Sequence, residues 1–431
     1  MKTRIIFALA LFAFSATGAW AQEALSLSQA IEIGLGQNYD IKISGQQEEV
    51  AGLQNTWGNA GMFPTLDFQA SLTENWSGED LERRNETIDP GLRMNWTVFN
   101  GFSVRINKAR LAELEELSAG NTQVVIENTI KDIITTYYQA LLEQERTAVA
   151  EKLAKLSSDR YHYTERQREI GTKVTYDLLQ SQNAWLQDKS NLLQQRVNYK
   201  NAVRRLNFVM GIKEDKEYVL TEKFEFQAPD YSFGDLEEKM LSSNSTLKNQ
   251  YIQQRLNRNS IRQAKSALYP RLSVGGGINK RYYPTAEDQG EIPAVKDDWG
   301  ANVALTLSYN IFNGGNRKRA IEIAKINTEI GDIQTEQLGH SLSNQLAQNF
   351  DSYKVQDEIL HLAIENQKAA ELNLKLSEQR YKSGNINSFN LRDIEIAYLN
   401  ASNSKLSAIY QLISIHSELL RMTGGIISQS E

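Results

Sequence analysis

The sequence lacks cysteine entirely and contains only six prolines in 431 residues. Without cysteine we expect no disulfide, no thiolate metal site and no lipid anchor on an N-terminal cysteine of the mature chain. Beyond the first 21 residues no stretch approaches 18 consecutive apolar residues, and the mean hydropathy is -0.48. These properties exclude a membrane protein whose spans are helices.

Clusters of charge and of catalytic side chains are also missing. The 47 basic residues are scattered among 53 acidic ones, with a net charge of -6 and no basic block, so no nucleic-acid partner is expected. No phosphate-binding loop and no Ser-His-Asp or cysteine nucleophile context appears. We therefore expect no enzyme activity, no metal and no cofactor. Each histidine stands without a second ligand at metal spacing: His162, His340, His361 and His416.

The N-terminus has the three parts of a secretory signal peptide. Lys2 and Arg4 precede apolar residues 5–14, and the small-residue pattern of residues 19–21 would place cleavage before Gln22. An uncleaved anchor is the alternative, but the apolar stretch is short for a span of ~20 residues. The mature chain is then either a soluble periplasmic protein or a β-barrel, because a closed barrel also satisfies its backbone hydrogen bonds in lipid.

An internal repeat covers most of the mature chain. The motif Val98-Phe99-Asn100-Gly101 recurs 213 residues later as Ile311-Phe312-Asn313-Gly314, and the same spacing separates Gly171 from Gly384. The connector between the repeats is charged and aromatic, and we expect it to carry one strand at 218–226. The predicted order is a signal peptide at 1–21, a first repeat at 22–211, a connector at 212–233, a second repeat at 234–425 and a tail at 426–431.

Each repeat begins with a predicted β-hairpin, at residues 65–99 and 271–312. Apolar and polar residues alternate after Pro64, and a polar loop is expected at 77–90. Strands of about ten residues with one apolar face and long polar loops are typical of transmembrane β-strands. A half-buried soluble sheet shows the same alternation, so this alternative stays open. The last strand is expected to contain Val303, Leu305, Leu307, Tyr309 and Ile311.

Each repeat continues as a pair of very long helices, at residues 102–210 and 316–422. No proline interrupts the first of these helices, and apolar residues recur in it at three-and-four spacing. At ~1.5 Å per residue it would reach on the order of 100 Å, which is more than a compact domain needs. We expect turns at Gly171 and Gly384 to return the chain as an antiparallel partner helix.

Four strands per chain cannot close a barrel, because the smallest transmembrane barrels need about eight and an open edge is not tolerated in lipid. Two chains would give eight strands and a filled interior, whereas three would give twelve and an open lumen. Identical subunits usually close by rotation. The expected fold is therefore α+β: a trimeric β-barrel, four strands per chain, that continues into a long periplasmic α-helical barrel.

Five short segments together point to one known family. They are 25–31 (LSLSQAI), 38–41 (NYDI), 63–66 (FPTL), the Phe-Asn-Gly elements at Phe99 and Phe312, and 380–384 (RYKSG). On these residues the chain resembles the TolC-type outer-membrane efflux family across essentially the whole mature sequence. The resemblance implies an outer-membrane channel of a tripartite efflux or type I secretion system in a Gram-negative bacterium, acting as a passive homotrimeric duct. The implied partners are outer-membrane lipid, a periplasmic adaptor (membrane fusion protein) and an inner-membrane pump of the RND, ABC or MFS type.

The resemblance also implies a gate and a docking surface near the two turns. Tyr381 matches a gating tyrosine whose partner position is Asp177, in a link between neighbouring helix pairs. Ile386 replaces the usual arginine. Of the two inward-facing acidic positions, the first is Asn390 and the second Asp393, so a ring of three Asp393 carboxylates would select cations. The implied adaptor-docking residues of the turns are Gly171, Thr172, Lys173, Ser383, Gly384 and Asn385.

These residues also have purely structural interpretations that need no gate or docking role. Gly171 and Gly384 are expected to be left-handed C-terminal caps. Asp177 and Asp393 lie near the start of the returning helices, where the helix dipole favours a carboxylate by ~0.3–1 kcal/mol. Two other classes of protein also fit parts of the pattern: a self-contained porin, which the helix length disfavours, and a non-channel periplasmic coiled-coil scaffold. The cargo stays open among drugs, metals and secreted polypeptides.

Overall fold

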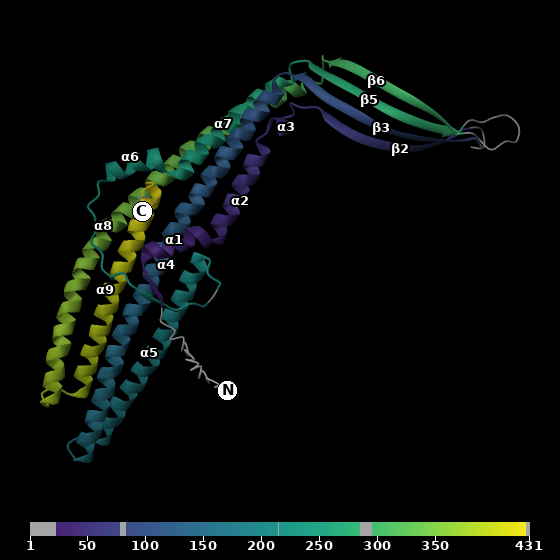
Figure 1. Cartoon of the computed structure of the whole chain (residues 1–431). Helices are drawn as coiled ribbons and strands as arrows, with labels where there is room; N and C mark the ends of the chain where they lie inside the picture. Colours follow the sequence, from purple (N-terminus) through teal and green to yellow (C-terminus); the bar gives the residue numbers. More distant parts are fainter. Residues whose placement is uncertain (1–22, 78–82, 214, 285–294, 428–431) are drawn as a thin grey trace, which may run out of the picture. The chain divides into compact units, whose positions relative to one another are not determined.

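The computed structural model describes residues 23–77, 83–213, 215–284 and 295–427 (Figure 1). The predicted signal peptide and the end of the predicted tail lie outside the described residues. The chain divides into two compact units. The first, the tip unit, comprises residues through 36, 132–227 and 356–414, and the second, the sheet unit, comprises 37–131, 228–355 and 415–431.

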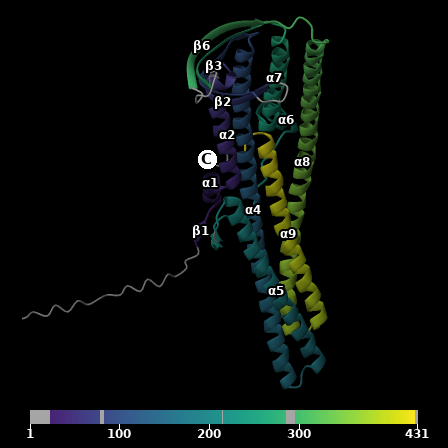
Figure 2. The same ribbon diagram turned by 90° about the vertical axis from the view of Figure 1, so that its right-hand side faces the viewer.

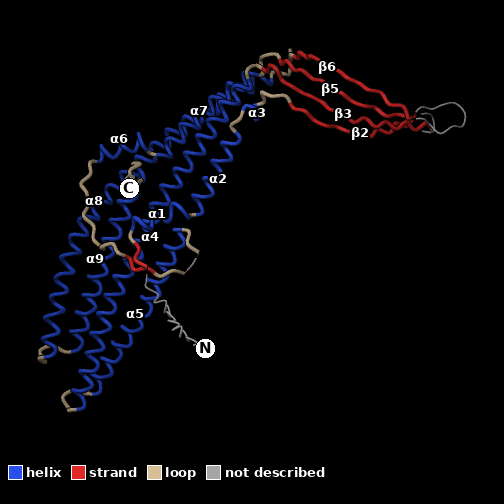
Figure 3. Tube along the Cα trace, in the orientation of Figure 1, coloured by secondary structure: helices blue, strands red, loops and turns tan. Residues whose placement is uncertain are grey.

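A four-stranded antiparallel sheet lies in the sheet unit (Figure 3). Its strand order is β2 (Thr65–Ser77), β3 (Arg83–Asn100), β5 (Arg271–Pro284) and β6 (Val295–Ser308). Both predicted hairpins are present, as β2 with β3 and β5 with β6, and the pairing of β3 with β5 joins them into one sheet. The two edge strands are β2 and β6.

The register of the four strands builds one apolar face from the alternation seen in the sequence. Residues directly opposite one another in a ladder share a face, and successive residues along a strand point to opposite faces. Each set of residues that lie opposite one another across the four strands forms a row. Rows alternate between the two faces, so the row between two apolar rows lies on the opposite face, and its residues are mostly polar. The apolar rows are Leu66, Met94, Gly276, Val303 and Phe68, Leu92, Ile278, Ala301, and the polar row is Asp67, Arg93, Gly277, Asn302.

The loop of the first hairpin is shorter than the expected 77–90. β3 already begins at Arg83, and Pro90 lies inside the strand, opposite Ala70. Proline cannot donate a hydrogen bond to a ladder. The pairing of β3 with β5 passes from Ile88 to Gly91, so Pro90 falls where that ladder is interrupted. The prediction of a long loop was wrong because the proline sits at a position that needs no N–H.

The last strand ends earlier than expected. Tyr309 and Ile311 were predicted to lie in it, but β6 ends at Ser308. The chain then turns at Gly314 and Gly315, whose φ angles are 67° and 78°. Glycine adopts this left-handed conformation without steric cost, and the two glycines end the extended segment before the next helix begins.

Two helical hairpins contain most of the remaining chain. The first is α4 (Ser103–Glu169) with α5 (Thr175–Met210), and the second is α8 (Asn316–Lys382) with α9 (Ser388–Met422). α4 and α8 have 67 residues each, and 213 positions separate their first residues. Figure 2 shows α5 alongside α4 and α9 alongside α8. Among the described residues, no helix is both long and apolar enough to span a bilayer.

Shorter helices flank these hairpins. Four begin with a capping side chain that accepts hydrogen bonds from the first turn: Ser26 for α1, Asn38 for α2, Thr56 for α3 and Asn244 for α7. The shorter helices are α1 (Leu27–Gln37), α2 (Tyr39–Gln54), α3 (Trp57–Ala60), α6 (Phe233–Ser243) and α7 (Ser245–Ser266).

A small parallel sheet of β1 (Glu23–Leu25) and β4 (Tyr218–Leu220) lies in the tip unit. The buried hydroxyl of Tyr137 in α4 donates a hydrogen bond of 2.8 Å to the carbonyl of Leu25, which fixes β1 against the helix. The strand predicted at 218–226 is present only at its start. β1 ends at Leu25, opposite Leu220, because the chain enters α1 at Leu27, so no strand residue is available to pair beyond Leu220.

Candidate functional site at the helical turns

The turns that end α4 and α8 have the same backbone geometry. Gly171 and Gly384 both have a φ of 79°, as predicted for left-handed C-terminal caps. In the first turn the N–H groups of Gly171 and Thr172 donate to the carbonyls of Arg168 and Gln167 at 2.9 Å. In the second turn Gly384 and Asn385 donate to Tyr381 and Arg380 at 3.0 and 2.8 Å. This pattern is the Schellman motif, which satisfies the last free carbonyls of a helix.

The side chains of the two turns are mostly exposed, and their bonds are local. Thr172 Oγ1 donates to the Gln167 carbonyl at 2.8 Å. Ser383 Oγ donates to the Arg380 carbonyl, and Asn385 Nδ2 donates to Ser383 Oγ, both at 3.1 Å. These bonds stiffen each turn from within. The half-buried Lys173 differs, because its Nζ lies 5.8 Å from the centre of the Tyr381 ring.

Exposed apolar side chains surround the turns in the tip unit. The rings of Tyr176 and Phe389, in the first turns of α5 and α9, lie 6.5 Å apart, although each side chain is more than half exposed. Ile170 and Val174 are also exposed, at 69% and 63%. Large apolar side chains in water at the end of a helical hairpin are a feature of surfaces that bind another protein.

Tyr381 is buried, with 7% of its surface exposed. Its hydroxyl lies 3.2 Å from Thr164 Oγ1 in α4, and its ring packs edge-on against Tyr163 with centroids 6.1 Å apart. It belongs to an apolar cluster with Leu374, Leu391 and Tyr398. Within one chain the structure therefore brings Tyr381 to Thr164. The link of Tyr381 to Asp177 between neighbouring helix pairs stays a prediction.

The other predicted gate residues lie at the start of the returning helices. Ile386, where the resemblance implies arginine, packs against the cluster that contains Tyr381. Asn390 is exposed, and its N–H donates to Asn387 Oδ1 at 2.9 Å, so it belongs to the cap of α9. Asp393 is exposed, and Asp177 lies half-buried in the first turn of α5. Ile386 thus makes an apolar contact where the resemblance implies a charge, and the gate role of these residues stays a prediction.

A buried group of four charged side chains, here called the ionic quartet, lies between α4, α5 and α9. Arg392 binds Asp188 through two parallel hydrogen bonds of 2.7 Å each. Arg160 Nη1 donates to Glu395 Oε1 at 2.7 Å, and Arg392 Nη1 also reaches Glu395 Oε2 at 3.3 Å. Exposed fractions of the side chains are 4% for Arg160, 2% for Glu395, 1% for Asp188 and 21% for Arg392.

Electrostatics inside the ionic quartet reflect a balance between burial and pairing. Burial raises the pKa of the Glu395 carboxyl, and the neighbouring Arg160 and Arg392 offset this only in part. Burial opposes the charge of Arg392, but its bonds to Asp188 and Glu395 outweigh that effect and raise the pKa of Arg392. Removing one partner from such a group leaves a buried charge without compensation. The ionic quartet therefore ties α9 to both helices of the first hairpin.

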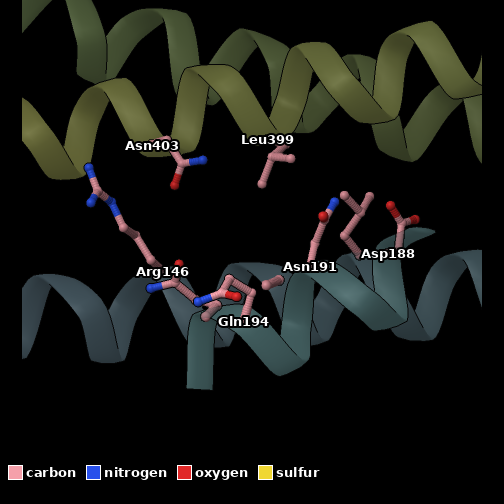
Figure 4. Close-up of a pocket in the computed structure, with 9 residues that line it drawn as sticks. Arg146, Asp188, Asn191, Gln194, Leu399 and Asn403 are labelled. Carbon is pink, nitrogen blue, oxygen red and sulfur yellow. The ribbon is translucent and has the colours of Figure 1, made fainter. Parts of the chain in front are cut away.

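A cavity of about 410 Å³ lies beside the ionic quartet (Figure 4). Asp188, Asn191 and Gln194 face it from α5, and Leu399 and Asn403 face it from α9. Its lining mixes uncharged polar, apolar and charged side chains, and the charged ones are Arg146 and Asp188. Among the described residues no group of histidine and carboxylate side chains is arranged to hold a metal ion. The cavity offers side chains that can form hydrogen bonds.

A second buried polar cluster lies in the sheet unit. Tyr231, from the segment before α6, forms a 2.8 Å hydrogen bond with His416 Nε2 in α9, and the two rings stack with centroids 5.9 Å apart. Tyr353 in α8 donates to the Pro229 carbonyl at 2.8 Å. Burial lowers the pKa of His416 to about 4, so the ring is neutral near pH 7. These contacts hold the connector against α8 and α9.

Sequence reasoning found the turns but missed the ionic quartet. The long helices contain many arginines, aspartates and glutamates, and periodicity within one helix does not show which of them face a helix from the other hairpin. Asp188 and Arg392 lie 204 positions apart in the chain. The only signal was that residues 188, 392 and 395 fall on the returning helices near the turns.

Solved structures with this fold include outer-membrane channels from several bacteria. The Campylobacter jejuni CmeC outer membrane channel superposes with a TM-score of 0.75 and 15% identity over 93% of this chain and 85% of that chain. A membrane protein from Pseudomonas aeruginosa gives a TM-score of 0.75 and 16% identity over 92% and 93%. The open state of the Neisseria gonorrhoeae MtrE outer membrane channel gives 0.72 and 17% over 93% and 89%. The fold is thus that of outer-membrane channels.

The family model described as outer membrane efflux protein matches residues 30–212 and 236–425, so the chain belongs to that family. Among curated proteins, nodulation protein T of Rhizobium leguminosarum bv. viciae is 21% identical over 308 residues, or 70% of this chain. The chain matches 61% of the length of that relative.

Proposed function

We propose that the chain forms an outer-membrane channel for efflux or secretion, with its sheet in the bilayer. The observation that carries this proposal is the exposed apolar face of the sheet. Val303, Leu305 and Leu307 in β6 are 85%, 69% and 69% exposed, and Leu66 and Phe68 in β2 are 69% and 71% exposed. Water would penalise such a face, at about 25 cal/mol per Å² of apolar surface, whereas lipid would not.

The opposite face of the same sheet suits water. A polar cavity of about 430 Å³ lies on it, lined by Gln69, Asp89, Arg93, Asn279 and Asn302 among others. Within it Asn279 Nδ2 donates to Asp89 Oδ1 at 2.6 Å. A sheet with one lipid face and one hydrated face is the wall of a barrel that encloses an aqueous lumen.

The free edges of β2 and β6 support an assembly of three chains. Unpaired backbone groups at a sheet edge are not tolerated in lipid. Pairing β2 of one copy with β6 of the next would close the barrel, and three copies would give about twelve strands and an open lumen. The two long helical hairpins of each copy would then extend the lumen into the periplasm.

The turns support a periplasmic partner. Their exposed apolar side chains, including Ile170, Val174, Tyr176 and Phe389, form a surface for the periplasmic adaptor (membrane fusion protein) of an RND, ABC or MFS pump. Docking there would involve the predicted residues around Gly171 and Gly384. The chain itself would be passive and would draw energy from the inner-membrane pump.

The experiment that tests the channel is conductance in planar bilayers with the purified mature protein. We expect discrete conductance steps, and a larger conductance for the double variant Tyr381→Phe with Asp177→Ala, because the variant weakens the proposed gate. Tyr161→Phe is the matched control, since its hydroxyl bonds Glu165 in the same helix at 3.2 Å. An unchanged conductance in the double variant would remove the gate assignment, and no conductance at all would remove the channel.

The competing function, a soluble periplasmic scaffold, makes the opposite prediction in fractionation. A scaffold would remain in the soluble fraction after lysis, whereas the channel would remain in the membrane after a high-salt wash. The exposed apolar face of the sheet favours the channel.

A further inference from the structure

Five elements of the sheet unit meet where the sheet joins the helices. The ring of Phe102, just before α4, packs 5.3 Å from Phe99 in β3 and 6.0 Å from Tyr269, which follows α7. Arg271 in β5 donates to Thr97 Oγ1 in β3 at 2.9 Å. Arg317 in α8 donates to the Ala267 carbonyl at 3.3 Å. These contacts make the ends of β3 and α7 and the starts of α4, β5 and α8 one continuous surface.

This surface, here called the junction belt, is strongly basic in an acidic chain. Its segments, residues 97–112, 259–271 and 309–321, contain no acidic residue, whereas the whole chain has a net charge of -6. Within the described part of the chain none of its basic residues forms an ion pair with a carboxylate. All except Lys108 and Arg317 are exposed. The basic residues are Arg105, Lys108, Arg110, Arg262, Lys265, Arg317, Lys318 and Arg319, together with Arg271, which precedes Leu272 and so lies on the polar face of the sheet rather than on the lipid side.

The helix dipole does not explain these charges. Arg105 lies in the first turn of α4, and Arg317, Lys318 and Arg319 lie in the first turn of α8, and neither first turn contains an acidic residue. The start of a helix carries partial positive charge, so cations there are unfavourable and carboxylates are preferred. An anion outside the chain would compensate both the side chains and the helix ends.

Exposed aromatic side chains lie in the same belt and beside the apolar face of the sheet. Within the belt Tyr269 is 53% exposed, Tyr309 56% and Phe312 82%, and Phe63, just before β2, is 63% exposed. Aromatic residues at this position are typical of the level of lipid headgroups, between the hydrocarbon core and water. Belt and apolar face are continuous, because Leu272 directly follows Arg271 and Leu307 lies two residues before Tyr309 in the chain.

We infer that the junction belt binds the headgroups of anionic phospholipids in the periplasmic leaflet of the bilayer. This inference rests on the proposed function, which places the sheet in the membrane. The guanidinium and ammonium groups pair with lipid phosphates, and the aromatic rings lie among the glycerol backbones. The belt thereby fixes the depth of the sheet and selects phosphatidylglycerol over phosphatidylcholine.

The test is lipid selectivity in vesicles. The mature protein, with Trp76, Trp185 and Trp299 replaced by Phe, keeps Trp57 and Trp96 near the belt. It is reconstituted with acyl-brominated phosphatidylglycerol or phosphatidylcholine, and quenching gives their relative binding constant. We expect phosphatidylglycerol to bind about fivefold more strongly, the factor for one cation facing an anionic headgroup. In 0.5 M salt the preference should fall toward one.

The decisive variant is Arg105→Gln with Lys265→Gln and Lys318→Gln, three exposed belt residues. We expect its relative binding constant to be near one. The control, Lys42→Gln with Lys239→Gln and Lys248→Gln, removes the same charge from exposed residues of the sheet unit outside the belt and should keep the preference. Equal quenching by both lipids in the parent protein, or equal loss in the two variants, would overturn the inference.

The same samples separate this inference from the proposed function. If the protein stays in vesicles after an alkaline wash but shows no preference for phosphatidylglycerol, the result supports the channel and contradicts lipid binding by the junction belt. If the protein binds only anionic vesicles and is released by salt, it has a basic surface but is not inserted in the bilayer. That result would contradict the channel.

Discussion

The tip unit hides charges, and the sheet unit exposes apolar side chains. In the tip unit Arg160, Asp188 and Glu395 are at most 4% exposed. In the sheet unit Val303 and Phe68 are 85% and 71% exposed. Each pattern is the reverse of what a water-soluble domain shows.

The two reversals have different causes. Buried charges can be compensated inside the chain, because the ionic quartet contains two arginines and two carboxylates that bind one another. An exposed apolar face cannot be compensated by its own chain and needs an apolar surrounding. The buried charges of the tip unit are therefore compensated within the chain, whereas in the proposed function lipid and neighbouring copies compensate the apolar face of the sheet unit.

The largest expected effect comes from breaking the ionic quartet. Arg392→Met leaves the buried carboxylate of Asp188 without the arginine that it binds, and we expect a loss of about 3–5 kcal/mol of unfolding free energy. Denaturant unfolding in detergent measures it. The matched control is Arg204→Met. Arg204 donates hydrogen bonds to Asp215 through Nε and Nη2, and both side chains are about half exposed. Solvent screens that pair, so the control should match the parent. Equal losses in both variants would show that burial of the quartet is irrelevant.

A charge on the apolar face should come next. Val303→Arg places a guanidinium in the proposed hydrocarbon layer, and we expect a cost of about 2–4 kcal/mol in vesicles. Asn302→Arg, the neighbouring position on the polar face, is the control and should cost little. Unfolding in denaturant with both variants reconstituted in vesicles measures the difference. If the two variants behave alike, the sheet does not distinguish a lipid face from a water face.

The His416 cluster predicts a pH dependence. Because burial lowers the pKa of His416 to about 4, the unfolded chain binds a proton below about pH 6.5 while the folded chain does not. Stability is therefore lost as the pH falls, by about 2 kcal/mol between pH 7.5 and 5. Comparison of unfolding free energies with His416→Asn isolates this residue, and the variant should lack that part of the slope. A parallel slope in both proteins contradicts the assignment.

The smallest expected effect is the difference between replacing a glycine in a helical turn and replacing one inside a helix. Gly384→Ala forces alanine into a left-handed backbone, and we expect a loss of about 1–2 kcal/mol. Gly339→Ala, inside α8 with open space around it, should instead gain about 0.5–1 kcal/mol. Thermal unfolding of the two variants should shift in opposite directions. Shifts of the same sign would mean that the turn does not hold its left-handed conformation.

Much of the fold was predictable because its signals are local. Alternation at period two gave both hairpins, the absence of proline gave the long helices, and the two glycines gave the turns. Prediction failed where partners from distant parts of the chain decide the outcome. Pro90 was read as a loop residue because the interrupted ladder between β3 and β5 is not visible in the sequence. The ionic quartet was missed for the same reason, since the contact between α5 and α9 sets it.

The candidate site was predicted less completely than the fold. The positions of Gly171 and Gly384 followed from the helix ends, but the surroundings of Tyr381 did not. Its hydroxyl meets Thr164 and its ring lies among apolar residues that include Ile386. At position 386 the chain has isoleucine where the resemblance implies arginine, and this changes the contacts of the neighbouring side chains. Those contacts depend on how the helices pack and cannot be predicted from the sequence alone.

The most direct test of a membrane-embedded sheet is a single-cysteine scan of residues 301–307 in β6, which the absence of native cysteine makes clean. A spin label at each position of the vesicle-reconstituted protein reports collisions with oxygen, which partitions into lipid, and with a water-soluble nickel chelate. We predict oxygen maxima at Val303, Leu305 and Leu307 and nickel maxima at Asn302, Ala304 and Thr306. Nickel accessibility at all positions without a period of two would contradict a lipid-facing sheet.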